Sequence, residues 1–362
     1  PAPGAPAPAA MAPPPPPPPP PGWVPPGYQM PYQQPPYHQP RPVPKAPEPP
    51  PARLPGANQS AQRPQAVTGP LRYYHNPQHL MPERAIMGMM QAVAGVDQSL
   101  KGGQLPDYDP LRRIVDEVID RLGSDVQKLS QGIEIRILNQ PHDQSHPVNV
   151  FILSIAMGLA MNYDPEQLRT LGLAALCHDI GKSAIPPEIL NKVGALTPHE
   201  VEMLRAHTLM GKRIMEKVSW ASPLMARIVY EHHERNDGSG YPLRLQEHQI
   251  HEMSKIVAIA EVYDALISDT SYRGRFSPEV AYNSIRVGER TGLDAKAIRA
   301  FQRYIVPYPI NSFVKLDTDE VGHVVAINRQ NLFKPVIKIG AETVDLAAQS
   351  QRAIVTSHFQ AY

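Results

Sequence analysis

The sequence has one cysteine, almost no net charge and no apolar run long enough to cross a membrane. Because Cys177 is the single cysteine among 362 residues, no disulfide can form within the chain, which fits a reducing compartment. The formal net charge of +1 excludes a global field that would gather DNA, RNA or an anionic membrane surface. The longest apolar stretch, residues 148–161, is shorter than the roughly 20 residues of a membrane span and predicts a buried helix.

No signal-peptide pattern is visible in the printed residues. Together with the lone cysteine, this predicts a cytoplasmic protein without a membrane span. We interpret Cys177 as a small buried residue beside a functional pair, and we expect any anionic substrate to be attracted by local charges.

The prolines are unevenly spread, since 30 of the 44 lie before residue 83. Residues 1–70 consist mainly of Pro, Ala, Gln and Tyr and include an unbroken proline run at 13–21. Such a segment prefers the polyproline II conformation and buries too little apolar surface to offset the entropy of ordering. We therefore predict a disordered tail over residues 1–70, which serves either as a spacer or as a ligand for proline-binding domains.

The rest of the chain divides into three parts by its hydrophobic pattern. Residues 71–141 show helical spacing, for example over 111–119, and predict a helical lead-in that packs on the next domain or mediates a homodimer. Residues 142–305 are a succession of helical patterns, with helix starts at 197–200 and 277–279. Residues 306–362 contain short β-branched runs at 312–316, 322–327 and 335–339, which predict a small β-rich segment.

Histidines and carboxylates recur at the ends of the helical patterns in residues 142–305. They are His146, the pair His178 and Asp179, His207, the pair His232 and His233, and the acidic residues Glu261 and Asp264. Imidazole and carboxylate groups suit Fe, Mn, Zn and similar metals, and this set has enough ligands for two divalent ions. Each histidine taken alone is more often a surface residue or a satisfied core residue than a metal ligand.

Local sequence supports the placement of these residues at the edge of a core. His178 and Asp179 follow the apolar residues 171–176, and Gly181 lets the backbone turn after them. Glu261 and Asp264 are three residues apart in the apolar run 256–267, which puts both carboxylates on one helical face. Two carboxylates at that depth need a cation, and a salt bridge to Arg or Lys is the alternative.

Two motifs make the resemblance to a known family specific. Residues 178–182 read HDIGK and resemble the HDxGK signature of HD-type phosphohydrolases, while residues 232–242 read HHERNDGSGYP and resemble the HHExxDGxGYP signature of the HD-GYP subfamily. Further matches lie at residues 196–200 and at 261–266, so the resemblance extends from about residue 146 to 301. It implies an HD-type helical bundle. The predicted fold is therefore mainly α, with the small β-rich C-terminal appendage and the disordered proline-rich tail described above.

The resemblance also implies the roles of individual residues. The implied metal ligands are His146, His178, Asp179, His207, His232, His233 and Glu261, with Asp179 bridging two ions. Glu261 stands where the family usually has Asp, and His142 stands where members with three metals have Glu. We therefore expect two divalent ions, Fe or Mn.

The implied activity is hydrolysis of cyclic di-GMP to pGpG, with GMP as a further product that the sequence leaves open. Two cations let a bridging water lose its proton near neutral pH and neutralise charge on the phosphate oxygens. Lys182 is the predicted catalytic and phosphate-contacting lysine, and Arg273 is a second phosphate ligand because guanidinium binds in a bidentate manner. The loop residues Asp237, Gly240, Tyr241 and Pro242 are predicted to border the substrate groove and to contact partner proteins.

Two alternatives remain open at this point. HDxGK alone spans many substrates, so the enzyme could be an HD phosphohydrolase for another nucleotide; the intact GYP loop disfavours this. A degenerate sensor would bind cyclic di-GMP without cleaving it and would signal through the tail, and Glu261 is the one feature that favours this alternative.

Overall fold

The computed structural model describes residues 83–124, 142–192, 194–268, 276, 278–308, 310, 312–349 and 351–357. The predicted disordered tail lies outside these residues, as do residues 71–82 and 125–141 of the predicted lead-in. The chain divides into two units, residues 1–68 and 69–362, and every element described below belongs to the second unit.

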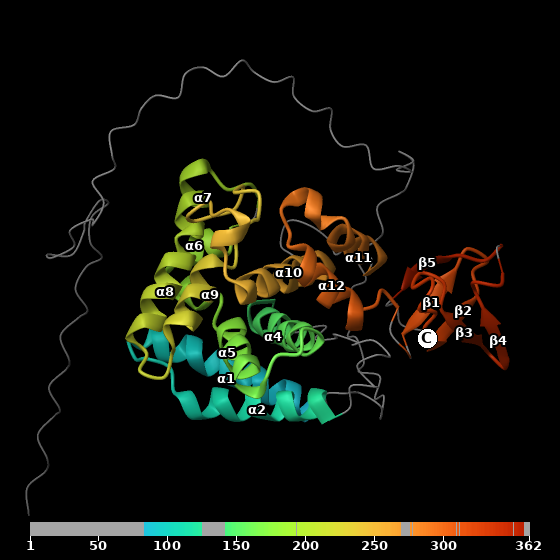
Figure 1. Ribbon diagram of the computed structural model, residues 1–362, viewed down its shortest axis with the longest axis horizontal. Coiled ribbons are helices and arrows are strands. Elements are labelled where there is room, and N and C mark those ends of the chain that lie inside the picture. The colour runs from blue at the N-terminus through green and yellow to red at the C-terminus, as the bar shows by residue number, and fades with distance from the viewer. Residues whose placement is uncertain are drawn as a thin grey trace, which may run out of the picture. The chain divides into compact units, whose positions relative to one another are not determined.

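The described residues are mainly helical, as predicted (Figure 1). The helices are α1 (Glu83–Lys101), α2 (Tyr108–Ser124), α4 (His142–Ala160), α5 (Pro165–Leu176), α6 (Pro187–Leu190), α7 (Pro198–Arg205), α8 (His207–Lys217), α9 (Pro223–Glu231), α10 (Glu252–Ile267), α11 (Pro278–Arg286) and α12 (Ala295–Tyr304). Three 3₁₀ turns lie between them: η1 (Ile180–Ala184), η2 (Glu247–Gln249) and η3 (Gly288–Thr291).

The predicted β-rich segment is a five-stranded antiparallel sheet. Its strands are β1 (Phe313–Leu316), β2 (Val321–Ala326), β3 (Val336–Ile339), β4 (Glu342–Asp345) and β5 (Ile354–Ser357), in the order β4-β3-β2-β1-β5. The first three correspond to the β-branched runs in the sequence, whereas β4 and β5 were not expected as separate strands. Val314, Val324 and Ile337 belong to its own small core.

Helix α4 is the most deeply buried helix around the site. It packs against α5, α10 and α12, and its residues 145–158 are buried on all sides. A helix that is apolar all round belongs inside a core, as residues 148–161 predicted. The same helix carries the buried polar residues His146 and Asn149.

Helix α5 begins with a capping box at Asp164, which accepts from the backbone of Glu166 and Gln167. Its Leu171 and Leu173 are fully buried, so the chain that follows is delivered at the edge of the core. The predicted start of α7 is confirmed by a second capping box at Thr197.

Gly181 sits where 3₁₀ turn η1 touches the backbone of α8. A Cβ atom on Gly181 would lie 1.9 Å from the His207 carbonyl oxygen and 2.4 Å from the Gly211 nitrogen. We expected this glycine to permit a turn, but what it permits is the close approach of two backbones. This approach places the residues after α5 beside the start of α8.

Replacing Gly181 with alanine is therefore expected to destabilise the fold. Overpacking typically lowers the free energy of unfolding by roughly 1–3 kcal/mol, and backbone atoms cannot move aside as a side chain can. Gly95→Ala in α1 is the matched control, because nothing lies within 4 Å of a Cβ there. Denaturant unfolding should show a clear loss for G181A and none for G95A; equal stabilities would contradict the close approach.

Candidate metal centre

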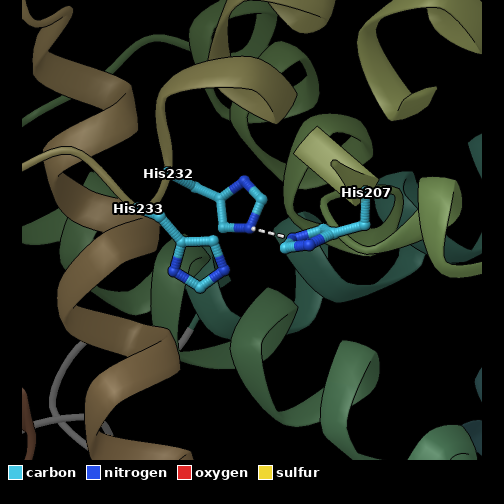
Figure 2. A group of neighbouring side chains, drawn as sticks. All are labelled: His207, His232 and His233. Carbon is cyan, nitrogen blue, oxygen red and sulfur yellow. Dashed lines mark hydrogen bonds between the residues drawn. The ribbon is translucent and has the colours of Figure 1, made fainter. Parts of the chain in front are cut away.

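Five histidines and one aspartate from four parts of the helical core converge. His146 comes from α4, His178 and Asp179 follow α5, His207 begins α8, and His232 and His233 follow α9. They form two groups whose nitrogen and oxygen atoms lie within 4.8 Å of one another: His207, His232 and His233, and His146, His178 and Asp179. Figure 2 shows the first group, with His232 and His207 pointing toward each other. The structure thus brings together six of the seven predicted ligands.

The Nδ1 atoms of four histidines are engaged by oxygen acceptors. His146 Nδ1 donates to Asp264 Oδ2 (2.6 Å), His178 Nδ1 to Ala175 O (2.8 Å), His207 Nδ1 to Leu204 O (2.7 Å) and His232 Nδ1 to Val229 O (2.8 Å). A neutral imidazole that donates through Nδ1 has a lone pair on Nε2. In the neutral imidazoles these contacts therefore leave the lone pair on Nε2, where it can bind a metal ion.

The Nε2 atoms of these histidines face one another in pairs. His146 and His178 have their Nε2 atoms 3.2 Å apart, and those of His207 and His232 are 3.4 Å apart. Two lone pairs at this distance repel unless a proton on one nitrogen makes a hydrogen bond or a metal ion binds both. Two nitrogens bound to one tetrahedral cation at about 2.1 Å would be about 3.4 Å apart, so the spacing fits metal binding.

Asp179 lies between the two histidine groups. Its Oδ2 is 3.3 Å from His178 Nε2 and 3.6 Å from His146 Nε2, while its Oδ1 is 3.4 Å from His207 Nε2. Oδ1 is buried and has no hydrogen-bond partner among the described residues. A carboxylate that reaches both groups can contact two ions at once.

The charge on Asp179 is favoured by its neighbours. Burial opposes ionisation, but the Lys182 ammonium, 2.5 Å from Oδ2, and His178 together hold the pKa of Asp179 well below its usual range. Burial also lowers the pKa of His207, His232 and His233. The pKa of His232 is lowered further by the nearby His178. These three imidazoles are therefore neutral near pH 7, the form that binds metal.

The two carboxylates of α10 face different partners. Glu261 Oε2 is 3.3 Å from His233 Nδ1 and has no hydrogen-bond partner among the described residues. Burial, partly opposed by His178, raises the pKa of Glu261 to about 7. Asp264 is fully buried and accepts from Asn149 Nδ2 at 2.7 Å as well as from His146. Of the two carboxylates, Glu261 therefore remains the candidate metal ligand. Asp264 instead orients His146.

The loop at residues 237–242 covers one side of the His207 group. The Tyr241 ring stacks on the His233 imidazole, with centroids 4.5 Å apart and planes at 23°. The Arg205 guanidinium lies 5.0 Å from the centroid of the same Tyr241 ring. Tyr241 thus contacts both a candidate ligand and a cationic side chain.

A pocket of about 460 Å³ lies beside this loop. Residues that line it include Arg205, Tyr230, Gly240, Tyr241, Pro242 and Arg244, whereas the histidines do not. Gly240, Tyr241 and Pro242 were predicted from the sequence, whereas the two arginines were not. Neither arginine is a fixed letter of the two signatures, so only its place in the fold reveals it.

Two other predicted substrate contacts have different outcomes. Asp237 accepts from the Ser239 nitrogen (3.0 Å) and hydroxyl (2.6 Å), so its carboxylate shapes the loop itself. Arg273 lies outside the described residues. Among the helices that are described, none combines the length and apolar character needed to cross a membrane.

Comparisons with known proteins agree with this geometry. The family model "HD domain" matches residues 132–297. The chain is 31% identical over 249 residues to "Cyclic di-GMP phosphodiesterase PA4108" of Pseudomonas aeruginosa, which covers 68% of this chain and 59% of that protein. It is 44% identical over 143 residues to "Cyclic di-GMP phosphodiesterase" of Thermotoga maritima, covering 39% of this chain and 38% of that protein.

A relative with a different named substrate is also similar. The chain is 37% identical over 132 residues to "3'3'-cGAMP-specific phosphodiesterase 1" of Vibrio cholerae, covering 36% of this chain and 30% of that protein. In every case the chain spans less than two thirds of the relative's length. The chain carries an HD domain of the HD-GYP family. The paired histidines and Asp179 are groups that could hold metal ions in this HD domain.

Adding a suitable divalent cation should stabilise the HD domain, because the folded histidine groups bind it and the unfolded chain does not. A free-ion concentration of about 100 times Kd corresponds to about 2.7 kcal/mol per site. The measurement is the unfolding temperature of chelator-stripped protein titrated with Mn²⁺. Mg²⁺, which prefers oxygen ligands, is the control and should have a smaller effect. An unfolding temperature that does not change when Mn²⁺, Fe²⁺ or Zn²⁺ is added would contradict a metal centre.

Proposed function

We propose that this chain is a metal-dependent phosphodiesterase that hydrolyses cyclic di-GMP to pGpG. The observation that carries the proposal is the pair of Nε2–Nε2 contacts joined by Asp179, since this arrangement gathers imidazole and carboxylate groups as a two-metal site requires. The names of the relatives supply the substrate. The product chromatography described below also tests whether pGpG is cleaved further to GMP.

Two ions, Fe or Mn, are part of the proposal. The first would be held by His146, His178 and Asp179, and the second by Asp179, His207, His232, His233 and Glu261. When bound, such a pair supplies a nucleophile near neutral pH and neutralises charge on the phosphate. Imidazole with carboxylate suits Fe and Mn, and a reducing environment keeps iron divalent.

The chain's own residues position the reaction. The Asp179 carboxylate lies where the two histidine groups meet, and the Lys182 ammonium neutralises its charge. The Lys182 side chain is 38% exposed, so its ammonium reaches solvent as well as Asp179 and is available to a phosphate oxygen. We assign Lys182 to charge stabilisation at the phosphate and Asp179 to the bridging of the ions.

The remainder of the substrate would lie along the loop at residues 237–242. Tyr241 offers an aromatic face, and Arg205 and Arg244 offer guanidinium groups that can contact phosphate or the acceptor edge of guanine. Gly240 and Pro242 shape this wall. Arg273 as a second phosphate ligand and Asp237 as a direct contact remain predictions.

The same loop is the proposed surface for protein partners, because Leu243 beside it is 53% exposed. The tail at residues 1–70 is the second proposed partner site, and the lead-in the proposed homodimer surface. We propose the domain limits 1–70, 71–141, 142–305 and 306–362. A cytoplasmic location rests on the single Cys177, which is buried and forms no disulfide.

Elemental analysis tests the number of ions. Protein purified without oxygen and fully loaded should contain about two ions per chain, as a two-metal hydrolase requires. The expectation follows from the two histidine groups sharing Asp179. A reproducible content of three, or of one, would contradict it.

Two substitutions test the roles of Asp179 and Lys182. Asp179→Ala should lower turnover by several orders of magnitude, because the ions lose their shared ligand. Lys182→Ala should keep both ions and lower turnover by roughly 10²–10³-fold, as for the loss of one preorganised charge. Lys192→Ala is the control, since Lys192 pairs with Glu200 at 2.6 Å on the surface. The measurement is chromatography of products from cyclic di-GMP with Fe²⁺ or Mn²⁺ under reducing conditions.

The same assay decides between the open alternatives. Faster turnover of 3'3'-cGAMP than of cyclic di-GMP would favour the other-nucleotide hydrolase, for which the Vibrio relative gives a precedent. Tight binding of cyclic di-GMP without any product would favour the sensor. In that case Glu261→Asp, which restores the usual family residue, should be tested for recovery of turnover.

A further inference from the structure

His233 is held differently from the other candidate ligands. The other four histidines donate Nδ1–H to a carbonyl or carboxylate oxygen. Within the described part of the chain, His233 has no such bond, and its Nδ1 instead faces Glu261 at 3.3 Å. Something else must fix the orientation of this ring, because a ligand imidazole that rotates freely binds metal weakly.

Tyr241 makes two contacts that can fix it. The Tyr241 ring lies on the His233 ring at 4.5 Å, nearly parallel to it, and the Tyr241 nitrogen donates to the His233 carbonyl oxygen at 3.2 Å. One residue therefore holds both the side chain and the backbone of His233. In Figure 2 the His233 ring projects from the chain after α9 toward the same region as His207.

The next residue, Glu234, holds the loop that carries Tyr241. Its side chain is buried, and its two carboxylate oxygens accept from the Leu243 nitrogen at 2.6 Å and the Leu245 nitrogen at 3.0 Å. The loop is also pressed against this point, because a Cβ on Gly240 would lie 2.5 Å from the Glu234 Cα. Glu234 thus clamps the returning limb of the loop immediately after Tyr241.

We propose that Glu234 is a positioning residue for the metal ligand His233. It fixes the loop at residues 243 and 245, which keeps the Tyr241 ring on the His233 imidazole and so holds that ligand in its binding orientation. The inference rests on the metal-binding role proposed above. Its predicted consequence is specific. Loss of Glu234 should weaken binding of the ion at the His207 group and leave binding of the ion at the His146 group unchanged.

A matched control lies one helical turn earlier. Glu231 is also buried, and it accepts from Arg227 Nε (2.6 Å), the His251 nitrogen (2.9 Å) and Ser254 Oγ (3.0 Å). It therefore fastens the start of α10 and does not contact the loop. A general effect of removing a buried carboxylate would appear equally at Glu231 and Glu234.

The experiment is an equilibrium titration of the full chain with Mn²⁺, with free Mn²⁺ counted by electron paramagnetic resonance. The variants are Glu234→Gln, Glu231→Gln, Tyr241→Leu and the double variant Glu234→Gln with Tyr241→Leu. Glutamine keeps the size of Glu234, but its NH2 group replaces one carboxylate oxygen and would face one of the two backbone N–H donors. Circular dichroism and thermal unfolding establish that each variant is folded.

The expected result is two binding events in the wild type, with one of them weakened about 10–100-fold in Glu234→Gln, the range for loss of a group that orients a ligand. Tyr241→Leu should weaken the same event by a similar factor. The double variant should be no weaker than Tyr241→Leu alone, because both residues act through one contact. Glu231→Gln should unfold at a lower temperature and bind Mn²⁺ as the wild type does.

Three results would overturn the inference. They are unchanged Mn²⁺ affinity in folded Glu234→Gln, equal weakening in Glu231→Gln, and additive effects in the double variant. If Glu234→Gln does not fold, Tyr241→Leu decides, since unchanged affinity there removes the proposed contact. Absence of Mn²⁺ binding in the wild type would instead contradict the metal centre itself, whereas failure to cleave cyclic di-GMP leaves this titration unaffected.

Discussion

The site depends on the hydrogen bonds that fix the tautomers of its histidines. Once Nδ1 of His146, His178, His207 and His232 donates to oxygen, the Nε2 lone pairs must point inward and face one another. In a buried space such a cluster is costly unless protons or metal ions satisfy it. The arrangement of the helices around the cluster therefore favours metal binding.

Three of these bonds use one local device. His178, His207 and His232 each follow a helix and donate back to the carbonyl three residues earlier, at Ala175, Leu204 and Val229. The last carbonyls of a helix have no partner within the helix, so a histidine at this position satisfies one of them and gains a fixed orientation. The helix ends thus become the frame of the metal centre.

This device explains which parts could be predicted from the sequence. Helix ends follow from local pattern, so the helices and the ligands beside them were predictable, and the tight motif at residues 178–182 identified the family of the site. The reason for Gly181 was not predictable, because the atoms that exclude a Cβ belong to α8, some 26 residues away at His207. The roles of Asp264 and of the pocket arginines likewise depend on contacts between distant segments.

His146 and His233 do not bond to the end of a preceding helix, and their orientation depends on partners elsewhere in the chain. These partners differ in how firmly they are held. His146 is oriented by Asp264, 118 residues away and fully buried, so its partner is held by the core itself. His233 is oriented by a ring on a loop, and that loop is held by the carboxylate of Glu234. Segments with few buried contacts open at lower free energy than core helices. In the proposed two-ion site, an ion held by the His207 group would therefore be the one whose binding responds to contacts made with the loop at residues 237–242.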